Sequence, residues 1–255
     1  MQSLLLFILA FQFFNSDPPQ DLLQKAQSAY RQGEQAQNIA ARKEAFNNAL
    51  SAYLELEKEN GSGRLFYNIG NTYFQLGEYP LAIYYYYRAE QLLPRVEDVK
   101  DNLQIAKAKL SLPPDKSQEV WKEIVTLHPW LSLPERFLLF ALFFALLIVL
   151  LSLYIWKPLP LWTFLAVIIG CVVLYLGSGL FYTRYIEPVQ GVLIKAAPLF
   201  RDAGEQYARV IEKPLPAGLK VEVLDQRENG TWLKILDPQA EIGFLPHSYI
   251  RLLEN

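Results

Sequence analysis

Two long stretches without a charged side chain, residues 137–156 and 161–183, constrain this sequence more than any other feature. A helix rises about 1.5 Å per residue, so roughly 20 residues cross a hydrocarbon core of ~30 Å, and each stretch is long enough to do so. Between them, the segment from Lys157 to Pro160 contains two prolines, which end the first helix and leave room only for a tight turn. The sequence therefore predicts a transmembrane hairpin with both flanks on one side of the membrane.

Aromatic residues at both ends of the two stretches support this interpretation. Trp130, Tyr182 and Tyr185 are expected at one membrane surface, and Trp156 and Trp162 at the other, because amphipathic rings prefer the lipid-water interface. The alternative is a buried hairpin in a soluble protein, which charge-free stretches of this length disfavour.

Small residues recur on both predicted helices. Ala141 and Ala145 lie one turn apart on the first, and Gly170 and Gly177 lie two turns apart on the second. Such spacing lets two helices approach closely, so we expect these residues to pack the hairpin on itself. A pore is not expected, because no ionisable group lies at membrane depth.

The first residues, 1–14, form another apolar run, too short to cross a membrane as a helix. It resembles the core of a signal peptide, although no Lys or Arg precedes it and Phe14 stands where a small residue is expected before a cleavage site, so a retained signal anchor is the alternative. Either would carry the following residues out of the cytoplasm. The charges flanking the hairpin lean weakly the other way, because the turn holds only Lys157 while Arg136 and Arg184 flank the outer ends.

Residues 21–108 are predicted to be helical, since they are rich in Ala, Leu, Gln, Glu and Tyr with apolar residues three and four apart. Within them, residues 63–94 predict a helix that ends at Gly77, a tight turn and a second helix opened by Pro80. Small residues at Gly70, Ala82 and Ala89 mark the positions where the two backbones would cross. This unit resembles the tetratricopeptide repeat in size and in the order of its large and small residues.

The neighbouring segments resemble the repeat less closely. Residues 22–33 and 45–56 look like the two helices of one unit, but residues 34–42 between them are longer than the family's turn. Residues 98–110 resemble the first helix of a third unit and are expected to cap the stack. Because each unit buries its apolar face against neighbours, a partner, a second copy of the chain or the membrane is expected to complete it.

The resemblance also suggests a partner-binding groove. The first helix of each repeat faces this groove, which would direct five side chains of one helix toward a protein ligand: Arg64, Tyr67, Asn68, Asn71 and Phe74. The alternative is that these are ordinary solvated or helix-stacking residues.

Beyond Arg184 the pattern changes from helices to short strands. Residues 219–223 alternate apolar and polar side chains, residues 228–230 predict a hairpin turn, and residues 231–235 form the returning strand. Several short strands in the C-terminal segment predict a small barrel.

The end of this segment, residues 243–250, resembles the end of an SH3 domain, and residues 216–218 with Trp232 fit the bacterial branch of that family. The resemblance implies a ligand-binding face formed by Trp232, Pro246 and Tyr249. Residues 192–197 lack the acidic, tyrosine-rich opening of the peptide-binding branch, so the alternative is that these aromatic residues only close a small core.

Other functional classes have little support in the sequence. The net charge is −2 without a basic block, which argues against nucleic acid as a partner. The single cysteine, Cys171, lies at membrane depth, and the two histidines, His128 and His247, have no ligand-spaced companions. We therefore expect no enzyme activity, no metal and no cofactor.

The predicted fold class is a multi-domain membrane protein with an all-α tetratricopeptide-like helical repeat, a two-helix transmembrane hairpin and an all-β SH3-like barrel. The predicted segments are a signal peptide or signal anchor (1–16), the repeat domain (20–110), a linker with a juxtamembrane amphipathic helix (111–134), the transmembrane helices (135–156 and 161–183) and the barrel (188–255).

This order of segments resembles the BatE family of bacterial aerotolerance-operon proteins. The resemblance implies a non-enzymatic scaffold of the bacterial inner membrane, with the repeats and barrel on the periplasmic side. It also implies protein partners of the BatA, BatB and MoxR types and a role in envelope stress tolerance. The alternative is an envelope protein whose barrel binds peptidoglycan. Homo-oligomers are compatible with both hypotheses.

Overall fold

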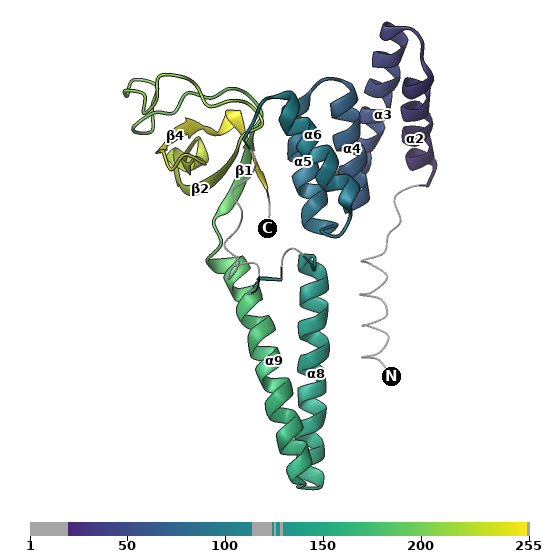
Figure 1. The fold of residues 1–255 in the computed structure, drawn as a ribbon, viewed down its shortest axis with the longest axis vertical. Helices are drawn as coiled ribbons and strands as arrows, with labels where there is room; N and C mark the ends of the chain where they lie inside the picture. The colour runs from purple at the N-terminus through teal and green to yellow at the C-terminus, as the bar shows by residue number, and fades with distance from the viewer. Residues whose placement is uncertain (1–19, 114–123, 125, 128–129, 254–255) are drawn as a thin grey trace.

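The structure is a computed structural model that describes residues 20–113, 124, 126–127 and 130–253 (Figure 1). It has three parts in chain order: a stack of helices, a long two-helix hairpin below it, and a small sheet beside the stack. The expected signal segment and most of the expected amphipathic helix lie outside the described residues.

The helical stack contains five helices, which pack as antiparallel neighbours because short connections join them. They are α2 (Gln20–Gln35), α3 (Ile39–Glu59), α4 (Gly63–Gln75), α5 (Tyr79–Leu92) and α6 (Glu97–Lys109). The helix pair expected over residues 63–94 is confirmed by α4 and α5. Its turn contains Gly77 in a left-handed conformation (φ 82°), which glycine adopts without steric cost, and Pro80 lies in the first turn of α5.

Gly70 shows why the helix crossing requires a small residue. A Cβ atom on Gly70 would lie 2.7 Å from the ring of Tyr86, which is closer than packed atoms approach. Ala82 and Ala89 on the facing helix are fully buried. The sequence prediction for this crossing is therefore confirmed.

The connection before α4 differs from its prediction. Residues 34–42 were expected to form a long turn, but α2 continues to Gln35 and α3 begins at Ile39. Asn38 ends the short connection by accepting a hydrogen bond from the backbone N–H of Ala40 (2.8 Å), which is the role of a helix N-cap. The turn prediction was wrong because this cap lets the second helix begin earlier than its apolar pattern does.

The hairpin consists of α8 (Leu133–Trp156) and α9 (Pro160–Tyr185), both long and apolar enough to cross a membrane. The predicted close approach holds at Gly177, where a Cβ atom would lie 3.3 Å from Phe140. It fails at the other small positions: nothing lies within 4 Å of a Cβ on Gly170, and Ala141 and Ala145 are exposed. Packing instead follows Ala166, Val173, Leu176 and Thr183 of α9, whose spacing continues one buried stripe.

The C-terminal part is one antiparallel sheet in the order β4-β3-β2-β1-β5. Its strands are β1 (Val189–Leu193), β2 (Lys220–Arg227), β3 (Trp232–Leu236), β4 (Ile242–Pro246) and β5 (Ile250–Leu253). The predicted turn over residues 228–230 is confirmed between β2 and β3, with Glu228, Asn229 and Gly230 all at positive φ. The β4 edge is covered in part by Phe200, which exchanges backbone hydrogen bonds of 2.7 and 2.8 Å with Phe244. A closed SH3 barrel stays a prediction.

The sheet packs against the helical stack through α5. Val192 of β1 and Leu253 of β5 are almost fully buried in the same apolar cluster as the repeat helices. Lys220 lies 4.5 Å from the ring centre of Tyr87, and a Cβ atom on Gly218 would lie 2.9 Å from Ile83. The stack was expected to need a partner, a second copy or the membrane, but within the described chain α6 and the sheet cover α5.

Candidate functional site

The repeat face, defined here as Arg64, Tyr67, Asn68, Asn71 and Phe74, lies along α4. Helical spacing places these five side chains on the side of α4 away from the buried residues Phe66, Ile69 and Tyr73. Arg64 is exposed and the other four are half-buried. The expected grouping on one side of the helix is therefore present.

Two of these residues are tied into the fold. The Asn71 side-chain oxygen accepts hydrogen bonds from the Tyr86 hydroxyl (2.8 Å) and from the Asn102 amide (3.0 Å). The same Asn102 amide donates to the Tyr67 hydroxyl at 3.0 Å. These contacts join α4 to α5 and α6, so Asn71 and Tyr67 position the helices in addition to lying on the repeat face.

The remaining members differ from one another. Phe74 packs edge-to-face on Tyr79, with ring centres 5.3 Å apart. Arg64 and Asn68 make no side-chain hydrogen bond or ion pair among the contacts of the described residues, so they are available to a ligand.

Sequence reasoning missed Asn102, because residues 98–110 were considered only as a cap. The sequence signal that could have identified Asn102 is its place in the segment that resembles the first helix of a third repeat unit.

Buried aromatic residues behind the repeat face fix α4 and α5. The Tyr85 hydroxyl donates to Glu57 at 2.8 Å, and the Arg88 guanidinium pairs with the same carboxylate while lying 3.8 Å from the ring centre of Phe66. Burial raises the pKa of the Tyr85 and Tyr86 hydroxyls, and it raises the pKa of Tyr53 to about 12. The Tyr85 and Tyr86 hydroxyls are therefore neutral donors at physiological pH, and their hydrogen bonds join α5 to Glu57 of α3 and Asn71 of α4.

The sheet face, defined as Trp232, Pro246 and Tyr249, combines two residues of the β3–β4 side of the sheet with one that directly precedes β5. Trp232 of β3 and Pro246 of β4 are paired across the two strands, and Tyr249 follows in the short 3-10 helix His247–Tyr249. All three side chains are half-buried. Sequence reasoning did not predict Phe200, whose ring packs edge-to-face on Trp232 with centres 5.8 Å apart.

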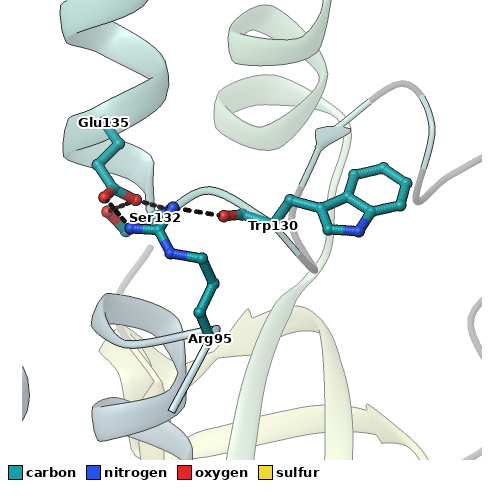
Figure 2. Close-up of polar contacts among 4 residues, drawn as sticks. All are labelled: Arg95, Trp130, Ser132 and Glu135. Atoms are coloured by element: carbon teal, nitrogen blue, oxygen red, sulfur yellow. Dashed lines mark hydrogen bonds and ion pairs between the residues drawn. The ribbon is translucent and has the colours of Figure 1, made fainter.

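A polar junction joins the stack to α8, and sequence reasoning missed it (Figure 2). Arg95, on the turn between α5 and α6, donates to the Glu135 carboxylate at 2.5 Å and to the Trp130 carbonyl oxygen at 2.8 Å. Glu135 also accepts hydrogen bonds from the backbone N–H and the hydroxyl of Ser132, at 2.8 and 2.9 Å. This junction lies at the start of α8, at the end of the hairpin opposite the turn at Lys157.

No group of three His, Cys, Asp or Glu side chains in the described ranges is arranged to hold a metal ion. The candidate features in the described part of the chain are the repeat face, the sheet face and the junction.

Comparison with known families agrees with the helical geometry. The family model of the tetratricopeptide repeat matches residues 63–95, which cover α4, α5 and the turn that carries Arg95. No curated protein matches the chain. Tetratricopeptide repeats are helical units that pack against neighbouring units, and the match points to a role in protein-protein interaction.

Proposed function

We propose that this protein is a non-enzymatic, membrane-anchored scaffold whose repeat face binds a protein partner. The observation that carries this proposal is the pair of exposed Arg64 and half-buried Asn68 on α4, within the matched repeat. An arginine fits a carboxylate through charge-assisted hydrogen bonds, and an amide fits the backbone of an extended or helical peptide. The neighbouring hydrogen bonds of Asn71 and Tyr67 hold this surface in place before a partner arrives.

The hairpin is proposed to anchor the protein by crossing a membrane. Large apolar side chains are exposed along both helices, including Phe137, Leu142, Phe164 and Leu174. Such a surface is costly in water and favourable in lipid. Because α8 and α9 are antiparallel neighbours, the helical stack and the sheet would lie on the same side.

The segment order supports a more specific setting. We propose the periplasmic side of a bacterial inner membrane, since an N-terminal apolar segment would export the stack. The resemblance to the BatE family then favours partners of the BatA, BatB and MoxR types and a role in envelope stress tolerance.

Photo-crosslinking from the full chain in native membranes tests the repeat face. A photoreactive residue in place of Asn68 should give a discrete adduct, while one in place of Ser51, exposed on α3, should give none. Arg64→Ala should weaken the Asn68 adduct, because it removes a charge without touching the helix crossings. Equal adducts from both positions, or none from Asn68, would contradict the proposal.

A second candidate function is peptidoglycan binding by the sheet face. It is favoured by the position of Trp232 and Pro246 on β3 and β4, whereas α5 occupies the β1 and β5 side. Trp232 and Pro246 therefore lie away from the strands that pack on the stack, and both are half-buried.

Sedimentation of the full chain with purified cell wall tests this candidate. Binding should be lost in Trp232→Ala and retained in Tyr207→Ala, which changes an exposed aromatic residue elsewhere in the sheet domain. Circular dichroism checks that both variants remain folded. If neither the native chain nor the control sediments with the wall, the second candidate is rejected.

A further inference from the structure

The helical stack is attached to the sheet and to the hairpin by interfaces of different kinds. The sheet interface is apolar and closed: Val192 and Leu253 are at most 1% exposed against α5. The link to α8 is polar and open, since the Arg95 and Glu135 side chains are 59% and 38% exposed. Closely packed apolar surfaces resist separation, whereas an exposed ion pair is weakened by water and salt.

One covalent connection between the hairpin and the rest of the chain is short. Only residues 186–188 lie between α9 and β1, so the sheet follows the hairpin directly on one side. On the other side, Arg95 reaches from the stack to the first turn of α8 (Figure 2). Release of Glu135 by Arg95 would therefore remove a direct contact between the stack and α8.

Glu135 is prepared for this contact by its own helix. One carboxylate oxygen accepts from Arg95, while the other accepts from the Ser132 N–H and hydroxyl in a capping box. The cap fixes the carboxylate whether or not Arg95 is bound, so the ion pair can open and close without unwinding α8.

We propose that the Arg95–Glu135 contact is a latch that sets the tilt of the combined stack and sheet on the hairpin. Closed, it holds the repeat face in one orientation relative to α8. Open, it no longer fixes that orientation. A partner that favours one tilt would thereby be coupled to the hairpin. This inference does not depend on which partner binds the repeat face.

Paired spin labels on the full chain in lipid nanodiscs test the latch. Labels replace exposed Gln104 on α6 and exposed Leu142 on α8, in a background with Cys171→Ser. The native latch should give one main distance. Arg95→Ala should raise the population at other distances about two- to fivefold, as expected for the loss of an exposed ion pair.

Two further variants separate the latch from nearby effects. Glu135→Gln retains an oxygen for the cap but loses the charge, so it should broaden the distances as Arg95→Ala does. Lys100→Ala removes an exposed ion pair with Glu97 inside α6 (3.3 Å), so it should leave the distances unchanged. The proposal is overturned if Arg95→Ala and Glu135→Gln keep the native distances, or if Lys100→Ala broadens them equally. Circular dichroism confirms that α8 is intact in each sample.

Discussion

Asn68 and Asn71 are neighbours on the repeat face, but only Asn71 has a structural role. Its oxygen is the acceptor for the hydroxyl of Tyr86, which is 1% exposed, and for the amide of Asn102. Among the described residues, the side chain of Asn68 makes no such hydrogen bond. Substituting Asn71 and Asn68 separately therefore distinguishes an effect on stability from an effect on partner binding.

Asn71→Ala is expected to lower the free energy of unfolding by about 1–3 kcal/mol, because it leaves a buried hydroxyl without its acceptor. Asn68→Ala is expected to change it by less than about 0.5 kcal/mol. Chemical unfolding of the full chain in detergent, followed by circular dichroism of the helical stack, measures both. Equal destabilisation by the two variants would mean that the Asn71 contacts do not support the fold.

The buried hydroxyl of Tyr53 is expected to make the protein less stable at high pH. Burial raises its pKa to about 12, whereas tyrosine in an unfolded chain titrates near 10. Between these values the unfolded state has released the proton and the folded state has not, so the free energy of unfolding falls as pH rises. The contribution is fully present below about pH 10 and is lost toward the folded pKa.

The test is thermal melting between about pH 8 and 12. The native chain should lose stability above about pH 10, and Tyr53→Phe should lose less, because it has no proton to release. Identical pH dependence in the two proteins would show that Tyr53 does not drive the decline.

At the scale of elements, α5 is the centre of the combined stack and sheet. It packs on α4 and α6 within the stack and on β1 and β5 of the sheet. All four tyrosines of residues 84–87 are buried as a result, although a single amphipathic helix would leave part of such a run in water. The sheet is thus a structural part of the repeat domain.

Leu253→Ala should therefore destabilise α5 as well as the sheet, by about 2–5 kcal/mol, as is typical of a fully buried leucine. Leu224→Ala, at a position that is 45% exposed on β2, is the matched control and should have little effect. Hydrogen exchange of the α5 amides measures the difference. Unchanged protection of α5 in Leu253→Ala would show that the sheet and the stack are independent.

The elements that could be predicted from sequence are those fixed by local patterns. The α4–α5 pair follows from helical periodicity together with Gly77 and Pro80, and the β2–β3 hairpin follows from residues 228–230. Asn102, Phe200 and Arg95 could not be predicted in their roles, because each contacts a residue more than 30 positions away. Such contacts depend on how whole elements pack, which periodicity does not encode.

At the scale of the whole molecule, we propose that the hairpin returns the stack and the sheet to one side of a membrane. The packing of the sheet on α5 supports this proposal, because two domains on opposite sides could not share an apolar cluster. In the proposed topology, the hairpin turn at Lys157 lies on the other side.

Cysteine labelling in intact cells with a membrane-impermeant reagent measures this directly. Single cysteines replace exposed Gln104 in the stack, Tyr207 in the sheet domain or Lys157 in the turn, in a Cys171→Ser background. We expect labelling at positions 104 and 207 in intact cells, and at position 157 only after the membrane is permeabilised. Labelling at 157 alone, or different accessibility of 104 and 207, would contradict it.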